Sequence, residues 1–185
     1  MTGNSNGGTL GFGQKVGQIM QMAYVVEDIH VAIAWWMADA RTGPWFLLDH
    51  FLAPGQSYRG APSQADVTIA MAFAGHMQIE LIQPLDNHPS VYREIIGQRG
   101  YGFHHVGIAC ADVDVEIPAY EARGYTLAFR AAVPTGGAVA YLDNGRNQPG
   151  MVELIPVTPG MDETFTRFWR ASLDWDGADP IRPFA

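Results

Sequence analysis

One order of predicted secondary structure occurs twice along this chain of 185 residues. Each half predicts a strand, then a helix, then three more strands. Short apolar runs bounded by Gly or Pro are typical of strands, whereas apolar residues at helical spacing are typical of helices. Two similar units of this kind can share one sheet and one cavity. The repeat therefore restricts the fold more than any other feature of the sequence, and it predicts an α+β protein.

The predicted elements divide the chain into five segments. The first residues are rich in Gly, Asn and Ser and lack the basic start and long apolar core of a signal peptide, so they predict a flexible tail. After them, Gly and Pro mark the ends of each module. The segments are a flexible tail at 1–17, a first βαβββ module at 18–84, a linker with a short helix at 85–101, a second module at 102–158, and a C-terminal helix with a tail at 159–185.

The boundaries of the single elements follow from the same signals. A polar loop is expected at 57–64, and the last residues, from 175 onward, are expected to lie over the surface. Strands are predicted at 18–26, 45–52, 66–74 and 77–83, and again at 102–110, 125–133, 137–142 and 150–157, with helices that begin near residues 28 and 112 and further helices at 90–97 and 161–173.

Charge and cysteine content limit the partners and the compartment. The net charge is −8, with 19 acidic against 11 basic residues and no run of Lys or Arg, so nucleic acid is not an expected partner. No stretch reaches the roughly 18 uninterrupted apolar residues of a membrane span, so no membrane partner is expected. Cys110 is the only cysteine and cannot form an internal disulfide, which indicates a reducing compartment and a cytoplasmic location.

Two adjacent histidines lie in the first strand of the second half. Strand alternation places His105 on one face with Phe103, Gly107 and Ala109, and it places His104 on the other face. Only one of the two imidazoles is then expected to face a given cavity. The alternative is that His105 is a core histidine with a satisfied hydrogen bond.

The first strands of the two halves can be aligned on their polar residues. Gln21 and His105 each stand seven residues before an aspartate, Asp28 or Asp112, that begins a predicted helix. Such a carboxylate can accept hydrogen bonds from the free amides of the first helical turn. Gln21 is thus the counterpart of His105.

The fourth strands of the halves each carry one glutamate among apolar residues. Glu80 and Glu153 occupy matching places, and a buried carboxylate requires a cation, a hydrogen-bond donor or a raised pKa. Either one could instead face solvent from an edge strand. A divalent metal would satisfy both glutamates together with Gln21 and His105, and this donor set suits Zn, Ni, Co, Mn or Fe(II).

These residues resemble the vicinal oxygen chelate superfamily, the group that includes glyoxalase I, methylmalonyl-CoA epimerase, extradiol dioxygenases and bleomycin-resistance proteins. The resemblance covers residues 18–158. It implies two paired βαβββ modules that form a cupped mixed sheet around a central cavity and a metal. Carried over by position, the implied ligands are Gln21, Glu80, His105 and Glu153. Their order is similar to that of some glyoxalase I enzymes, whereas the sequence around Glu80 and before His105 looks more like methylmalonyl-CoA epimerase.

The resemblance implies a metal-dependent isomerase, epimerase or lyase that removes a proton next to a carbonyl of a small or bulky hydrophobic substrate. The metal would hold the carbonyl and stabilise the enolate, and Glu153 and Glu80 are the candidates to carry the proton. The alternative is a non-catalytic protein that binds a small molecule, as bleomycin-resistance proteins do. Extradiol dioxygenases use two His and one Glu, so ring cleavage ranks lower.

The remaining predictions concern the substrate and the assembly. The lack of a basic patch argues against coenzyme A thioesters, because phosphates favour Arg or Lys. The resemblance implies a homodimer. Further candidates for substrate contact, each with a surface or core role as the alternative, are His50, His76, Tyr58, Tyr101 and Tyr141.

Overall fold

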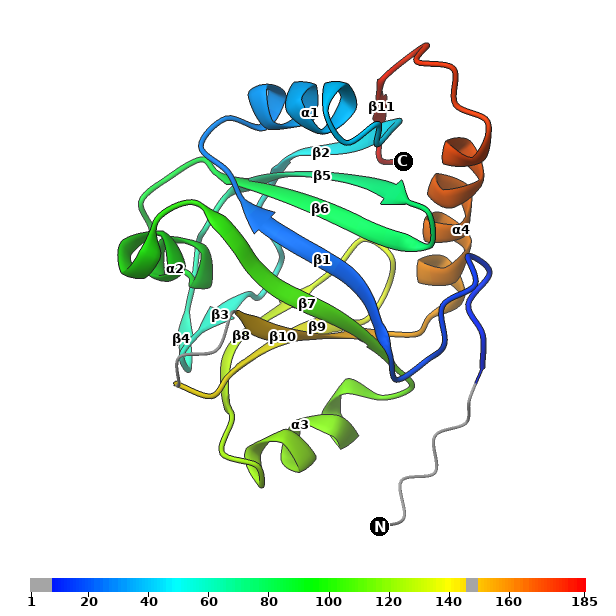
Figure 1. Cartoon of the computed structure of the whole chain (residues 1–185). Helices are drawn as coiled ribbons and strands as arrows, with labels where there is room; N and C mark the ends of the chain where they lie inside the picture. The colour runs from blue at the N-terminus through cyan, green and yellow to red at the C-terminus, as the bar shows by residue number, and fades with distance from the viewer. Residues whose placement is uncertain (1–7, 146–149) are drawn as a thin grey trace.

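The computed structural model describes residues 8–145 and 150–185. All of its named strands belong to one 11-stranded sheet, whose order is β11-β2-β5-β6-β1-β7-β10-β9-β8-β3-β4. The sheet curves so that the two halves of the chain form its two sides (Figure 1). The predicted α+β fold, with paired βαβββ modules, a cupped mixed sheet and a C-terminal helix, is confirmed.

The repeated order of elements is present in both halves. In the first half the elements are β1 (Ile19–Val25), α1 (Ile29–Ala38), β2 (Trp45–Phe51), β5 (Val67–Ala74) and β6 (Met77–Pro84). In the second half they are β7 (Gly102–Cys110), α3 (Val113–Glu121), β8 (Thr126–Ala132), β9 (Ala138–Asp143) and β10 (Met151–Pro156). Helix α2 (Val91–Arg99) connects the halves, and α4 (Pro159–Leu173) follows the second.

Aspartate caps begin the two equivalent helices, as their positions predict. The carboxylate of Asp28 accepts hydrogen bonds from the backbone amides of His30 and Val31, at 2.9 and 3.0 Å. Asp112 caps α3 in the same way. Each cap ends the preceding strand and turns the chain over the convex face of the sheet, where α1 and α3 lie (Figure 1).

The largest apolar cluster fills the concave side of the sheet. It joins side chains of strands from both halves to residues of α2 and α4, for example Tyr92 and Phe168. Two smaller clusters lie under the outer helices, one with Ile29 and Ile33 of α1 and one with Val113 of α3. Together α2 and α4 flank the concave side that holds the site.

Three short strands were not predicted. β3 (Ser57–Tyr58) and β4 (Ala61–Pro62) form within the expected polar loop, and β11 (Ile181–Pro183) forms within the expected surface tail and pairs with β2. Strands of two or three residues are too short to show alternation, so the sequence carried no signal for them. β3 also pairs with β8, so residues 52–66, hereafter the crossing segment, reach from the first module to the edge of the second.

The predicted flexible tail at 1–17 is wrong for its second part. Residues 1–7 lie outside the described residues, but residues 8–17 pack on the core, where Leu10 is 4% and Phe12 0% exposed. The Phe12 ring lies edge-on to Phe73, with centroids 5.1 Å apart. Two apolar residues among glycines are too few to show a period, which explains why the sequence suggested a tail.

Among the described residues, no helix has both the length and the apolar character needed to cross a membrane.

Candidate metal centre

Four adjacent strands, β6, β1, β7 and β10, bring the four predicted ligands together. Directly paired residues of neighbouring strands point to the same face of a sheet. One row of paired positions runs Glu80, Ala23, His105 and Met151 across these strands. The next row on the same face runs Gln78, Gln21, Gly107 and Glu153. The duplication thus supplies two carboxylates, an imidazole and an amide from neighbouring rows.

The side chains of the four predicted ligands are buried and converge on the imidazole Nε2 of His105. This atom lies 3.0 Å from Glu153 Oε2, 3.4 Å from Glu80 Oε2 and 3.4 Å from Gln21 Oε1. The amide nitrogen of Gln21 donates to Gln78 Oε1 at 2.8 Å. That bond turns the Gln21 carbonyl oxygen toward the imidazole, so all three neighbours of Nε2 are oxygen atoms.

Small residues leave room for this arrangement. Ala23 stands between the positions of Glu80 and His105, and Gly107 stands between those of Gln21 and Glu153. A Cβ at Gly107 would lie 2.6 Å from Gln21 Oε1 and 2.8 Å from Ile155 Cδ1. Any other residue at 107 would therefore displace the Gln21 amide.

A β-bulge changes the predicted orientation of the two histidines. In the pairing of β1 with β7, Ala23 lies opposite His105 and Tyr24 opposite Phe103, so His104 is an extra residue. Both imidazoles are fully buried, and their Nδ1 atoms are 2.8 Å apart. Phe103 instead contacts Tyr24, in the smaller apolar cluster beneath α1. The predictions that His104 faces away from His105 and that Phe103 shares its face are wrong, because a bulge inverts strand alternation.

The hydrogen bonds of His104 determine the tautomer of His105. The Val91 carbonyl, which can only accept, lies 3.3 Å from His104 Nε2, so Nε2 carries the proton. Burial lowers the pKa of His104 well below its usual value, and its neutral Nδ1 must accept from His105 Nδ1. In neutral His105 the Nε2 atom therefore has a free lone pair, directed at the oxygens of Glu80, Glu153 and Gln21.

We expect His104→Phe to lower the affinity of the site for divalent ions by about 10- to 100-fold, as changes in residues that orient a ligand typically do. The substitution removes the acceptor for His105 Nδ1 while it keeps an aromatic ring of similar size. His104→Asn, which retains an acceptor oxygen, is the control and should recover part of the affinity. Competition with a chromogenic chelator measures both. Equal affinity in wild type and His104→Phe would contradict the tautomer argument.

The electrostatics of the site favour a bound cation. Burial, and then the charge of Glu153, raise the pKa of Glu80 well above its usual value. Glu80 Oε2 is buried and receives no hydrogen bond. A lone pair on Nε2 and two carboxylates at these distances repel one another unless a proton or a cation lies between them.

The donor set fits a divalent metal. Ligand atoms from Glu80, His105 and Glu153 all lie within 4.8 Å of one another. One imidazole nitrogen, two carboxylates and an amide oxygen suit Zn or other first-row metals and would leave positions for water or substrate. The identity of the metal does not follow from these ligands.

A cavity opens from the ligand residues into the concave side of the sheet. Gln21, Glu80 and Glu153 form part of its lining, together with two tyrosines, Tyr92 and Tyr141. The two phenol hydroxyls are hydrogen-bonded to each other, and burial raises the pKa of both. Both phenols are therefore neutral, and their pair keeps one proton to donate. Sequence reasoning missed Tyr92, because its place in the linker helix gave no signal that it would face the cavity.

Of the five candidates for substrate contact, only Tyr141 lies in this lining. Its ring also packs on His105, with centroids 4.8 Å apart. The structure does not bring the others to the cavity; they are His50, His76, Tyr58 and Tyr101.

Two of these side chains have other partners, and a third is exposed. The Tyr58 hydroxyl donates to Glu94 at 2.7 Å, and His76 Nδ1 donates to the Phe12 carbonyl at 2.7 Å. Tyr101 is 46% exposed. None had a neighbour in sequence that indicated these partners.

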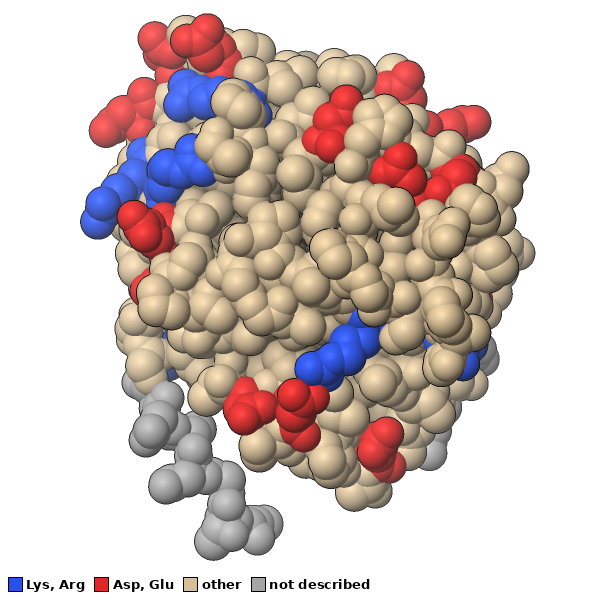
Figure 2. Space-filling view, turned by 180° about the vertical axis from the view of Figure 1, so that it is seen from behind, with Lys and Arg blue, Asp and Glu red and all other residues tan. Residues whose placement is uncertain are grey.

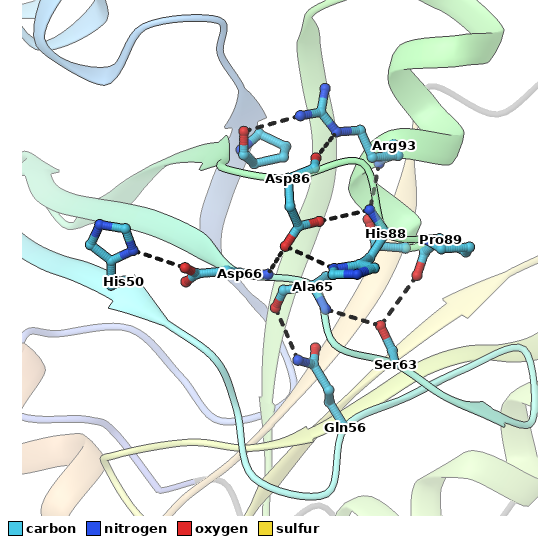
Figure 3. A network of polar contacts seen from close by, with 11 residues as sticks. His50, Gln56, Ser63, Ala65, Asp66, Asp86, His88, Pro89 and Arg93 are labelled. Atoms are coloured by element: carbon cyan, nitrogen blue, oxygen red, sulfur yellow. Dashed lines mark hydrogen bonds and ion pairs between the residues drawn. The ribbon is translucent and has the colours of Figure 1, made fainter.

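The fourth candidate outside the cavity, His50, belongs to a network of hydrogen bonds that holds the crossing segment in place (Figure 3). Its Nδ1 lies 2.8 Å from Asp66 Oδ2, and the Asp66 amide donates to Asp86 at 2.7 Å. Gln56 in turn donates to the Ala65 carbonyl at 2.9 Å. Gln56 and Ala65 line the cavity, so the network positions this wall rather than a catalytic group.

A model of the Glyoxalase/Bleomycin resistance protein/Dioxygenase superfamily matches residues 20–141, a range that includes three of the four ligand positions. No curated protein matches the chain.

Several solved structures share the fold. A hypothetical protein from Bacillus halodurans C-125 is 21% identical, with a TM-score of 0.57, and the match covers 76% of this chain and 94% of that protein. Methylmalonyl-CoA epimerase from Mycobacterium tuberculosis is 18% identical, with a TM-score of 0.57 and coverage of 88% and 97%. A Streptomyces coelicolor methylmalonyl-CoA epimerase variant, in complex with 2-nitronate-propionyl-CoA, is 14% identical, with a TM-score of 0.54 and coverage of 78% and 96%.

Proposed function

The chain belongs to the Glyoxalase/Bleomycin resistance protein/Dioxygenase superfamily, that is, the vicinal oxygen chelate superfamily, and from this premise we propose that it is a metal-dependent isomerase, epimerase or lyase. It removes a proton from the carbon next to a carbonyl group. The observation that carries the proposal is the convergence of Glu80, Glu153 and Gln21 on His105 Nε2 at the wall of a cavity.

Gln21, Glu80, His105 and Glu153 would hold the metal. A divalent ion bound there supplies a Lewis acid for the developing enolate oxygen, a contribution of several kcal/mol to barrier lowering in comparable sites. Glu153 and Glu80 reach the cavity from opposite sides of the β1–β7 pair, so each can accept a proton from substrate. Two carboxylates allow return of the proton to either face. One hydroxyl of the hydrogen-bonded Tyr92–Tyr141 pair has a proton that is not used within the pair. That hydroxyl can donate a hydrogen bond to a substrate oxygen.

The complete ligand set favours an enzyme over a protein that only sequesters a small molecule. A binding protein requires a cavity but gains nothing from two buried carboxylates beside an imidazole, whose mutual repulsion is costly without a cation. Three oxygen donors and one nitrogen donor, with a single histidine, also differ from the two-His, one-carboxylate set of iron oxygenases. Proton transfer therefore ranks above both sequestration and ring cleavage.

The test is solvent deuterium exchange at the acidic carbon, followed by NMR, across α-hydroxy ketones, acyl-CoA esters and aromatic ketones. Protein is treated with chelator and then reloaded separately with Zn²⁺, Ni²⁺, Co²⁺ or Mn²⁺. The proposal expects exchange that depends on one of these ions and disappears on chelation. No exchange in the panel, together with no thermal stabilisation by any ion, would favour the sequestering protein instead.

A further inference from the structure

The cavity is polar at the ligand residues and mostly apolar elsewhere. The polar lining groups beyond the ligands are Gln56, Thr135 and the two tyrosines. The other walls are hydrocarbon from both modules and from the crossing segment. They include Leu48, Phe51, Ile69, Met71, Phe129 and Val139.

No lysine, arginine or histidine is among the residues that line this cavity in the described part of the chain. The cation of the crossing segment, Arg59, is held by the carboxylates of Glu94 at 2.6 Å and Asp143 at 2.7 Å, so it is already neutralised. On the face seen in Figure 2, basic side chains lie in a few small groups, and acidic side chains lie beside those at its upper left and lower edge. Away from the ligand residues, the described lining therefore offers no positive side chain to pair with a carboxylate or phosphate of a substrate.

Part of the apolar wall comes from the end of the chain. Phe165 of α4 and Phe184 after β11 both line the cavity, although the superfamily model stops at residue 141. The Phe184 ring packs on Phe168, with centroids 5.2 Å apart, and its amide donates to the Leu47 carbonyl at 3.0 Å. These contacts hold the C-terminal segment against β2 and make it a fixed wall of the site.

We propose that the site takes an uncharged, largely hydrophobic carbonyl compound and discriminates against carboxylates and coenzyme A thioesters, with Phe184 as a residue that determines this specificity. The inference rests on the proposed function for the identity of the reacting group. The apolar character of the pocket is independent of that function, because it follows from the lining residues alone.

A measurement of ligand binding tests this inference independently of catalysis. The probes are benzoin, which is an uncharged α-hydroxy ketone with two phenyl rings, its 4-carboxy derivative, and propionyl-CoA. Calorimetric titration uses the Glu153→Gln variant, so that no turnover obscures the heats. We expect saturable binding of benzoin and at least tenfold weaker binding of the two charged probes, because an anionic group would lose its hydration in a pocket that keeps the carboxylate of Glu80 and has no basic side chain in its described lining.

Three variants in the same background test the walls. Phe184→Ala should weaken benzoin binding about tenfold, whereas Ile181→Ala, on the same terminal segment but outside the cavity lining, should change it less than twofold. Val133 is half-buried in the lining, so a positive charge introduced there should favour a charged ligand. Val133→Arg should raise the affinity for carboxybenzoin at least tenfold. Circular dichroism verifies the fold of each variant.

Equal or tighter binding of either charged probe overturns the inference, as does the absence of saturable benzoin binding. Its failure can be told from that of the proposed function. Benzoin binding without proton exchange on any compound would refute the enzyme and keep the uncharged ligand. Exchange on propionyl-CoA alone would keep the enzyme and refute the uncharged substrate.

Discussion

Replacing Glu153 with Gln is expected to slow deuterium exchange at the substrate's acidic carbon by about a thousandfold, within the range that general-base groups contribute. The substitution removes a basic oxygen and keeps the size of the side chain. Glu153 Oε2 lies 3.0 Å from His105 Nε2 and the residue lines the cavity, so it is placed to meet substrate. Exchange is followed by NMR at saturating metal, and metal content is measured on the same samples, because Gln is also a weaker ligand.

The matched control is Glu163→Gln, the same change at an exposed position of α4. It should leave both exchange and thermal stability unchanged within error. If Glu153→Gln keeps full metal content and exchanges at the wild-type rate, Glu153 has no part in proton transfer. Loss of exchange with loss of metal would instead assign it the role of ligand alone.

The duplication explains why the ligand positions could be predicted from sequence. Strand alternation has a fixed period, and a repeated module places equivalent residues at equivalent heights of the sheet. Gln21 with His105 and Glu80 with Glu153 were found by alignment of one half on the other. The structure adds that β1 and β7 are neighbours. Oxygen atoms of Gln21 and Glu80 therefore lie 3.4 Å from Nε2 of His105.

The remaining features of the site depend on contacts between residues far apart in sequence. The bulge at His104 inserts one residue into a ladder, and no local pattern marks it. Tyr92 enters the cavity from the linker, and Phe184 enters from the residue that follows β11, a strand of only three residues. Apolar or aromatic residues in such segments are equally consistent with surface packing. Distance information is needed to assign them to a pocket.

Divalent ions are expected to raise the thermal midpoint of the wild-type protein, and this increment should grow as pH rises. In the metal-free protein, burial and the charge of Glu153 raise the pKa of Glu80 above its value of about 4.5 in an unfolded chain. Protonated Glu80 is therefore favoured by folding. That stability is fully present below the unfolded pKa and is lost as pH rises through the raised one. Over the same range the proton ceases to compete with the ion.

Glu80→Gln isolates this contribution, because the neutral amide has no proton to lose. Chelated Glu80→Gln should keep the stability that chelated wild type loses as pH rises above about 4.5 and through the raised pKa of Glu80. A hundredfold loss of ion affinity would remove about 2.7 kcal/mol of ion-dependent stabilisation, or roughly 5–10 °C for a chain of this length. Differential scanning calorimetry of both proteins, with chelator and with each ion, measures the difference between their thermal midpoints. The contributions of exposed groups that titrate in both proteins cancel in this difference. Parallel pH curves for the chelated proteins would show that Glu80 does not titrate with folding, and equal ion-induced shifts would show that it does not bind the ion. If no ion shifts the midpoint of either protein, the four convergent side chains are a polar cluster without a metal.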